Sequence, residues 1–239
     1  MELLASHRRA ARVLIVGVGG LGAPAAETLA AAGVGTLGLV DPDRVEPSNL
    51  HRQSLYGSAD VGHPKVEVTA ERLQAAHPWL RTETWRLRFG PEHAALVGGF
   101  DVVLDGTDTI AAKFTVNDAA VAAGVPLVHA GVLGFRAQLV TVLPGASACY
   151  RCLFEEPPPP GDVPSCEEAG VLGPTAALAA ALQAAEALRV LSGRPALAGR
   201  LLSIDLLAGR HRLVPIEPNP RCPACATAPT ACAPRSEAP

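Results

Sequence analysis

Apolar residues in the first half of the chain fall into short β-branched runs separated by longer alanine-rich segments. The runs at 12–16, 36–40, 101–104 and 126–129 have the length and composition of buried strands. Strands that alternate with helical segments are typical of a doubly wound, mostly parallel sheet in the α/β class. The segments with helical periodicity are 23–32, 64–76, 92–97 and 110–123, and a further strand with alternating residues is expected over 82–88.

The pattern changes after the fourth of these runs. Residues 136–143 form a longer strand-like run that no helix follows. Residues 150–174 are irregular and include four consecutive prolines, and an alanine- and leucine-rich helix is expected over 175–191. Two further strand-like runs then follow each other directly, at 200–206 and 211–216. Strands in this order predict an antiparallel extension of the parallel sheet.

No flexible linker separates these parts, so residues 1–225 are predicted to form a single domain. Residues 226–239 consist largely of Ala, Pro and Thr, and we expect this tail to be disordered.

Composition narrows the classes of function. Hydrophobic residues make up 49% of the 239 positions but aromatic residues only 4%, so the core consists mainly of Ala, Val and Leu. A net charge of -3 argues against nucleic acid as a partner, since nucleic acid selects a strongly basic face. No run reaches the ~18 apolar residues of a membrane span, and residues 1–10 lack an apolar signal region. We therefore expect a soluble, cytoplasmic protein.

The first predicted strand ends abruptly in glycines, at Gly17, Gly19, Gly20 and Gly22. Glycines allow a tight turn and close approach of a ligand to the backbone, and the helix that follows offers unpaired N–H groups to a phosphate. Asp41 lies 19 residues beyond Gly22 at the end of the second strand, where an acid can bind ribose hydroxyls. This Rossmann-like order predicts a nucleotide site; the alternative is a glycine-tight turn without a ligand.

Two basic residues follow the second strand. Arg52 and Lys65 are placed where they could reach a triphosphate, Arg52 as a planar fork and Lys65 as a point charge. The alternative is an ordinary solvated loop.

A polar turn, Asp105 to Thr109, follows the buried run at 101–104. Ligands of open α/β sheets bind at this edge, and a carboxylate there can hold Mg²⁺ against phosphates. The competing interpretation is a helix N-cap formed by Asp108 or Thr109.

Four of the six cysteines form two C-x-x-C pairs, which are separated by 69 residues. Each pair suits a tight turn that presents two thiolates to one tetrahedral zinc ion. Four thiolate ligands leave no open position, so the zinc would be structural and would join distant segments; free or redox-active thiols are the alternative. The pairs are Cys149 with Cys152, and Cys222 with Cys225.

Cys166 and Cys232 have no such partner in the sequence. The neighbours of Cys166 are acidic, which disfavours a thiolate, so the residues alone leave an incidental cysteine and a nucleophile equally open.

Together these motifs resemble the ThiF/MoeB/HesA family, the bacterial relatives of ubiquitin-activating enzymes. The resemblance extends from about Arg12 to Cys225 and would not be expected of a generic Rossmann protein. The motifs that carry it are residues 17–22 (GVGGLG), 48–53 (SNLHRQ), 62–66 (GHPKV), 105–108 (DGTD), the two C-x-x-C pairs and residues 166–171 (CEEAGV).

The resemblance implies an ATP-dependent adenylyltransferase. Family members use MgATP to adenylate the C-terminal glycine carboxylate of a small ubiquitin-like sulfur carrier ending in Gly-Gly, of the ThiS or MoaD type. The products are an acyl-adenylate and pyrophosphate, and the activated carrier then receives sulfur from a donor for thiamine, molybdopterin or thiolated-tRNA synthesis. The resemblance does not identify the carrier, the pathway or the sulfur donor. A homodimer is expected through the alanine-rich helix and the crossover segment.

The resemblance also assigns roles to individual residues. Asp41 corresponds to the ribose-binding acid and Asp108 to the magnesium carboxylate. Asn49, Arg52 and Lys65 correspond to the phosphate-binding set. Cys166 corresponds to a crossover-loop cysteine that some relatives use covalently and others do not need.

Two features depart from the family pattern. Residues 1–11 do not contain the Arg-Tyr-x-Arg-Gln-type segment whose arginine reaches ATP in the neighbouring subunit, and Thr109 stands where relatives have Asn. These departures motivate one alternative, a non-catalytic scaffold of the same family that binds nucleotide or carrier. The glycine motif by itself also permits an NAD(P)-dependent oxidoreductase, although the cysteine pairs, Arg52 and Lys65 argue against it.

Overall fold

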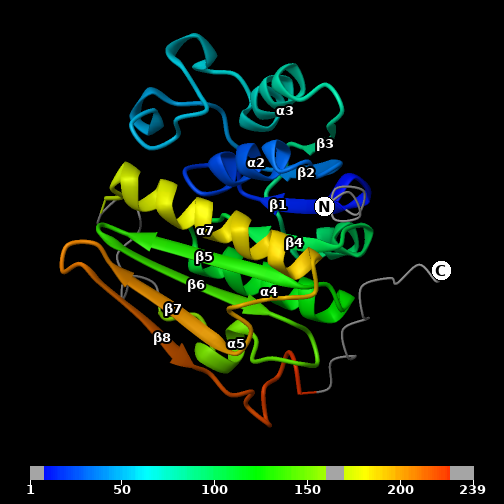
Figure 1. Cartoon of the computed structure of the whole chain (residues 1–239), viewed down its shortest axis with the longest axis vertical. Helices are drawn as coiled ribbons and strands as arrows, with labels where there is room; N and C mark the ends of the chain where they lie inside the picture. Colours follow the sequence, from blue (N-terminus) through cyan, green and yellow to red (C-terminus); the bar gives the residue numbers. More distant parts are fainter. Residues whose placement is uncertain (1–7, 160–169, 227–239) are drawn as a thin grey trace.

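One eight-stranded sheet runs through a computed structural model that describes residues 8–159 and 170–226 (Figure 1). The strand order is β3-β2-β1-β4-β5-β6-β7-β8. The first five strands pair in parallel and the last three are added antiparallel, which confirms the predicted α/β class with its antiparallel extension. The strands are β1 (Arg12–Val16), β2 (Thr36–Val40), β3 (Arg81–Trp85), β4 (Val102–Asp105), β5 (Leu127–Leu133), β6 (Arg136–Val142), β7 (Arg200–Asp205) and β8 (Arg210–Pro215).

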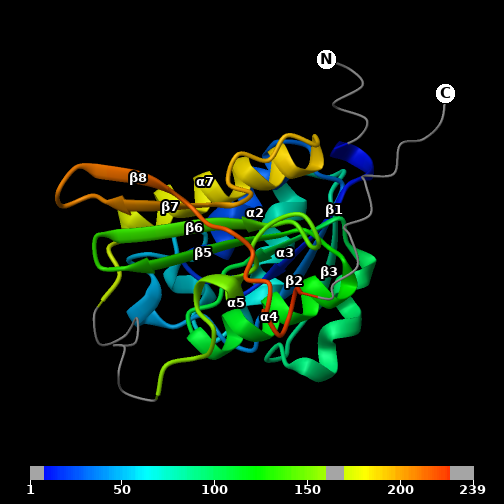
Figure 2. The same cartoon turned by 90° about the horizontal axis from the view of Figure 1, so that it is seen from below.

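Helices cover both faces of the sheet (Figures 1 and 2). Helices α2, α3 and α7 pack on one face, and α4 and α5 lie on the other. None of the helices in the described part of the chain is long and apolar enough to cross a membrane. The α-helices are α2 (Gly22–Ala31), α3 (Lys65–Ala76), α4 (Ile110–Ala123), α5 (Tyr150–Leu153) and α7 (Gly173–Leu191), and the 3₁₀ segments are Pro47–Asn49, Ser58–Asp60 and Pro91–Gly99.

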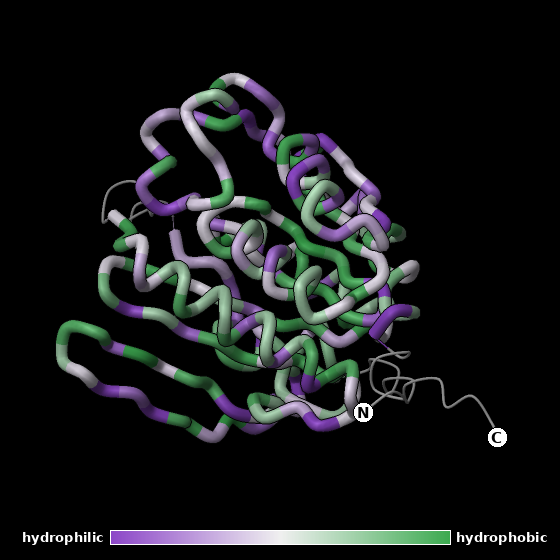
Figure 3. The backbone as a smooth tube through the Cα atoms, turned by 45° about the horizontal axis from the view of Figure 1, so that its top comes forward, coloured by the Kyte–Doolittle hydropathy of each residue, from purple (hydrophilic) through white to green (hydrophobic). Residues whose placement is uncertain are grey.

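Strand β1 supplies side chains to two cores because successive strand residues point to opposite faces. Val13 and Ile15 pack with the α2, α3 and α7 side, whereas Leu14 and Val16 pack with the α4 side. Burial on both faces explains why the central strands are continuously apolar in sequence. In Figure 3 hydrophobic stretches run through the middle of the molecule, whereas the outer loops mix hydrophilic and hydrophobic stretches.

Several boundaries differ from the prediction. Strand β5 continues to Leu133 because its last residues pair with β6 in a hairpin that sequence periodicity does not reveal. The segment expected to be irregular from residue 150 begins with the single helical turn of α5. Helix α7 begins at Gly173, two residues earlier than predicted, with a proline in its first turn, where the missing N–H costs nothing. Strand β3 ends at Trp85, short of the predicted residue 88.

The bounds of α4 agree with the prediction, and Gly124 ends it in the left-handed conformation at φ 68°. Residues 227–239, where we expect disorder, lie outside the described residues.

Candidate functional site

The glycine loop lies against the polar turn that follows β4. Gly17 has a positive φ of 89°, and a Cβ atom placed on it would come 2.8 Å from the backbone of Gly106. A Cβ on Gly22 would meet the carbonyl oxygen of Gly17 at 1.8 Å. Only glycines permit this approach, so the loop after β1 and the turn after β4 form one tight backbone unit. No side chain caps the N-terminus of α2. The Ala23 N–H donates to the Gly19 carbonyl at 3.1 Å and Pro24 has no N–H, so the Gly22 N–H is the donor that the first turn leaves for a phosphate.

Asp41 connects the end of β2 to the glycine loop. Its Oδ2 accepts a hydrogen bond from the Val18 N–H at 2.8 Å, and its Oδ1 accepts one from the Asp43 N–H at 2.8 Å. Burial raises the pKa of Asp41 above its ordinary value, against the opposing effect of Lys65 and the two N–H groups. The carboxylate is therefore held rigidly at the sheet edge where a ribose is expected.

The segment carrying Arg52 also packs on this loop. A Cβ on Gly20 would lie 3.3 Å from the Arg52 carbonyl oxygen and 3.6 Å from its Cγ. The Arg52 guanidinium donates to Asn49 Oδ1 at 2.5 Å, so the two residues are held together. The structure thus brings Asn49 and Arg52 together beside the glycines.

Lys65 is the first residue of α3 and is only 5% exposed. Its Nζ donates to Asp43 Oδ2 at 3.0 Å, and its charge acts on Asp41. Arg52 and Lys65 are therefore both hydrogen-bonded to residues that flank the edge of the sheet where the nucleotide is predicted to bind.

The turn after β4 is organised by a fully buried carboxylate, Asp105. Its Oδ1 accepts hydrogen bonds from the Thr107 N–H and hydroxyl at 2.9 and 2.6 Å. Its Oδ2 accepts from Lys113 Nζ at 3.0 Å and from His129 Nδ1 at 2.7 Å. Burial by itself would raise the pKa of Asp105, but the Lys113 ammonium and the His129 hydrogen bond hold it well below its ordinary value.

Sequence reasoning missed Lys113 and His129. A signal was present for each: a lysine in the first turn of a helix opposes the helix dipole, and a histidine ended an otherwise apolar strand run. Both need a partner to be stable there, and the partner is Asp105.

The sequence left Asp108 and Thr109 open as the N-cap of α4; the cap is Thr109, whose hydroxyl accepts a hydrogen bond from the Ala112 N–H at 3.3 Å. Asp108 is exposed on the same turn. The two interpretations of the turn are therefore compatible, because the cap and the candidate magnesium carboxylate are different residues.

The four cysteines of the two C-x-x-C pairs converge, with all four sulfur atoms within 4.8 Å of one another. Cys149 and Cys222 Sγ are 3.6 Å apart, and Cys152 and Cys225 Sγ are 3.4 Å apart. Four sulfurs at ~2.3 Å from a tetrahedral ion would be separated by about 3.8 Å. Burial, with the neighbouring Cys152, raises the pKa of Cys149 to about 11, so this sulfur is a thiolate at neutral pH only when a cation lies beside it. The cluster has the geometry of a metal site.

Cys166 lies in the segment 160–169, outside the described residues, so its predicted role stays a prediction.

Comparison with known proteins identifies the family. The family model described as ThiF matches residues 4–224, nearly the whole chain. The chain belongs to the ThiF family. This confirms the resemblance drawn from the motifs, and it gives no support to a dinucleotide-dependent oxidoreductase.

Relatives with known names show which members of the family the chain resembles. The chain is 48% identical over 228 residues to the sulfur carrier protein adenylyltransferase of Thermus thermophilus, covering 92% of this chain and 84% of that protein. It is 44% identical over 219 residues to the probable adenylyltransferase/sulfurtransferase MoeZ of Mycobacterium tuberculosis, covering 89% of this chain but 56% of that protein. It is 43% identical over 216 residues to the SAMP-activating enzyme E1 of Haloferax volcanii, covering 90% and 80%.

A solved structure supports the fold. MccB of E. coli in complex with MccA-N7isoASN superimposes with a TM-score of 0.85 at 24% identity, covering 95% of this chain and 70% of that one.

Proposed function

We propose that this ThiF-family chain is an ATP-dependent adenylyltransferase that activates the C-terminal glycine carboxylate of a ubiquitin-like sulfur carrier. The observation that carries the proposal is the contact of Arg52, paired with Asn49, against the glycine loop beside Asp41. The pyrophosphate of a dinucleotide is bound by the glycine loop and the helix N-terminus, whereas a triphosphate requires further cations that bind its oxygens. The names of the relatives that share 43–48% of the sequence agree with this activity.

The proposed reaction joins the carrier to AMP. A carboxylate oxygen of the carrier attacks the α-phosphorus of ATP, an O–P bond forms, and the bond to the β-phosphate oxygen breaks to release pyrophosphate. The carboxylate is already a nucleophile, so no general base is needed, and the barrier is the negative charge around the phosphates. Loop N–H groups, Arg52 and Lys65 neutralise that charge, and Asp41 orients the ribose.

Asp108 is the residue that would hold magnesium, since its exposed carboxylate lies on the turn that packs against the glycine loop. A bound Mg²⁺ would supply positive charge to the phosphate oxygens during displacement.

A pyrophosphate–ATP exchange assay with carriers ending in Gly-Gly tests the function. We expect carrier-dependent exchange in the wild type and its loss, by at least about 100-fold, in Asp108→Ala with unchanged circular dichroism. Glu71→Ala removes an equally exposed carboxylate from α3 and should retain full exchange. Near-normal exchange in Asp108→Ala would remove Asp108 from the site. Tight ATP binding without exchange, for any intact carrier, would favour the non-catalytic scaffold.

We propose that the four clustered cysteines hold one structural zinc ion. Four converging sulfurs leave no position for substrate, which is the arrangement of a structural site. The ion would tie the segment after β6 to the segment after β8.

We further propose that residues 1–225 act as one adenylation domain, in the cytoplasm and as a homodimer. The alanine-rich α7 buries one face in its own chain, and its outward residues, among them Ala177, Ala181 and Ala185, remain for a second copy. Analytical ultracentrifugation measures the mass of the assembly, and a sedimenting species with the mass of one chain would contradict the homodimer.

The acyl-adenylate would then accept sulfur from a donor protein. A covalent role of Cys166 in that step predicts that Cys166→Ala keeps pyrophosphate exchange but loses formation of the thiocarboxylate. A variant that keeps both would make the cysteine incidental.

A further inference from the structure

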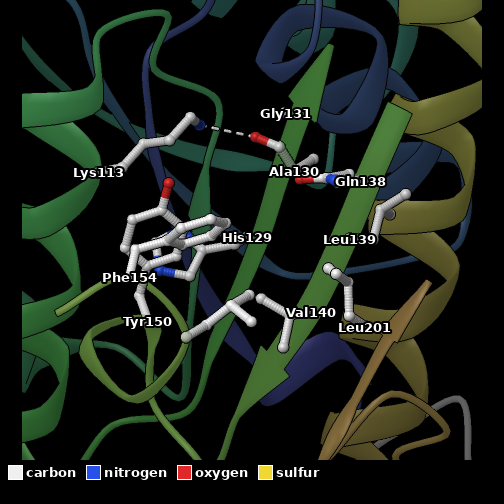
Figure 4. Close-up of a pocket in the computed structure, with 11 residues that line it drawn as sticks. Lys113, His129, Ala130, Gly131, Gln138, Leu139, Val140, Tyr150, Phe154 and Leu201 are labelled. Atoms are coloured by element: carbon white, nitrogen blue, oxygen red, sulfur yellow. Dashed lines mark hydrogen bonds between the residues drawn. The ribbon is translucent and has the colours of Figure 1, made fainter. Parts of the chain in front are cut away.

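A small pocket of about 40 Å³ opens beside the Asp105 network, between α4, α5 and the hairpin of β5 and β6 (Figure 4). Its polar groups are the side chains of Lys113, His129 and Gln138 and the Tyr150 hydroxyl, and the rings of Tyr150 and Phe154 form one wall. A buried water molecule requires a cavity volume of roughly 10–15 Å³, so the pocket has room for a few waters or for part of an extended peptide backbone.

His129 presents an unpaired acceptor in this pocket. The side chain is 3% exposed and its Nδ1 hydrogen bonds to Asp105 Oδ2 at 2.7 Å. Because the carboxylate can only accept, Nδ1 carries the proton, and Nε2 of the neutral ring is an acceptor. Nε2 is buried and has no hydrogen-bond partner, which is costly unless a ligand or water supplies a donor.

Lys113 presents a matching donor. Two of its three N–H groups are used, one to Asp105 Oδ2 at 3.0 Å and one to the Ala130 carbonyl at 2.7 Å. Figure 4 shows this side chain at the rim of the pocket, facing the end of β5. One acceptor and one remaining donor match the N–H and C=O of a peptide unit.

The floor of the pocket suits a backbone without large side chains. Gly131 lines it, and a Cβ atom there would meet nothing nearer than Lys113 Cε at 3.9 Å. The pocket is therefore open over bare backbone between two polar groups.

Strand register places the pocket level with the glycine loop. Val16, the last residue of β1, is in register with Asp105, and Asp105 is in register with His129. Neighbouring strands are ~4.8 Å apart, so His129 lies about 10 Å sideways from the strand that carries the loop. An extended chain covers that distance in roughly three residues.

We propose that this pocket binds the C-terminal peptide of the carrier, with a peptide N–H donating to His129 Nε2 and a peptide carbonyl accepting from Lys113 Nζ. The bound peptide unit lies about three residues before the carboxylate that reaches the nucleotide. This inference rests on the proposed adenylation of a carrier tail and assigns its binding subsite.

The test separates the two nitrogens of His129. The His129→Asn variant keeps an amide N–H near the position of Nδ1 for Asp105 and removes Nε2. Calorimetry with a nonhydrolysable ATP analogue measures the binding of two probes, a carrier ending in Gly-Gly and the same carrier without its last four residues. We expect about 5- to 10-fold weaker binding of the intact carrier to His129→Asn, and no change for the truncated carrier or for the ATP analogue alone.

A second pair of variants tests the pocket without touching its hydrogen bonds. Gly131→Val fills the floor and should weaken binding of the intact carrier. Gly98→Val is the matched control, because its added side chain also starts in open space but lies outside the pocket, and it should bind the carrier normally. Unchanged binding in both His129→Asn and Gly131→Val would mean that the pocket holds water only, and equal losses for intact and truncated carriers would place the effect outside the tail. Either result overturns the inference about the pocket. The proposed function is tested separately by pyrophosphate exchange in the wild type, and it stands if that exchange is observed. Absence of exchange and of carrier binding in the wild type would overturn both.

Discussion

At the scale of single residues, Asp105 decides the electrostatics of the candidate site. It is completely buried and still ionised, because Lys113, His129 and Thr107 all donate to it. Burial lowers the pKa of His129 below its ordinary value and Lys113 adds to this, against the opposing effect of Asp105, so the ring stays neutral while the carboxylate stays charged. The two protonation states together keep Nδ1–H directed at Asp105.

The same pKa shifts predict a dependence of stability on pH. Unfolded histidine takes up a proton near pH 6.5 while folded His129 does not, so the free energy of unfolding should fall as pH drops below about 6.5. A second fall is expected below about pH 4, where only the unfolded state protonates Asp105. Each group contributes a slope of at most ~1.4 kcal/mol per pH unit.

Urea denaturation from pH 8 down to about pH 2 measures both parts of this profile. The variant His129→Asn should lose the component between pH 7 and pH 5, whereas His211→Asn, which changes an exposed histidine of β8, should keep it. Parallel profiles for His129→Asn and the wild type would contradict the assignment of a neutral buried ring.

At the scale of elements, α7 is held to the sheet by polar groups as well as by its alanine face. Gln183 Nε2 donates to the carbonyls of Asp105 and Val128, both at 2.8 Å, so this helix contacts the strand end that carries the site. Glu186 Oε1 accepts from the Thr141 hydroxyl and from the N–H groups of Ala196 and Leu197 at 3.0, 2.8 and 2.7 Å. One carboxylate oxygen thus joins α7, β6 and the segment that leads to β7.

We predict that Glu186→Ala lowers the free energy of unfolding by about 3–5 kcal/mol, because three donors lose a buried charged acceptor at once. Arg189→Ala is the matched control. It removes a 3.6 Å ion pair to Glu186 from a side chain that is 55% exposed, and such a pair contributes at most ~1 kcal/mol. Equilibrium urea unfolding measures both, and similar losses in the two variants would show that the ion pair, rather than the three donors, matters.

At the scale of the whole molecule, the cysteine cluster joins the two ends of the antiparallel extension, the segment after β6 and the segment after β8. Cys149 and Cys152 lie at the short helix α5 after β6, and the second pair follows β8. A metal ion here would bridge β6 and β8 independently of the hydrogen bonds between their strands. The outer strand β8 has exposed residues throughout, so little apolar burial holds it in place.

We predict one zinc ion per chain by elemental analysis, and its loss in Cys222→Ser. Removal by a chelator should lower the melting temperature by several degrees and expose the β7–β8 hairpin to proteolysis first. The Cys166→Ser variant is the control, because Cys166 belongs to neither pair and should leave the zinc content unchanged. A metal-free wild type with the same melting temperature would contradict a structural ion.

Much of the fold could be predicted because its signals are local. Periodicity gave the bounds of β1, β2 and α4, and the left-handed Gly124 marked the end of α4. The glycine loop was also predictable from a local signal, since the positive φ at Gly17 is a property of that one residue. The candidate nucleotide site was predictable for a related reason: parallel strands end at one edge, so residues that follow such strands meet there.

Contacts between distant segments were decided only by the tertiary structure. Nothing in the spacing of Lys113 and His129 says that both reach Asp105, because periodicity reports the face of an element and not its neighbour. The extension of β5 depended in the same way on its hairpin partner, β6. The sequence by itself determined which elements form and which residues carry chemistry; strand order and register decided which of those residues share one carboxylate or one pocket, because these contacts depend on chain topology.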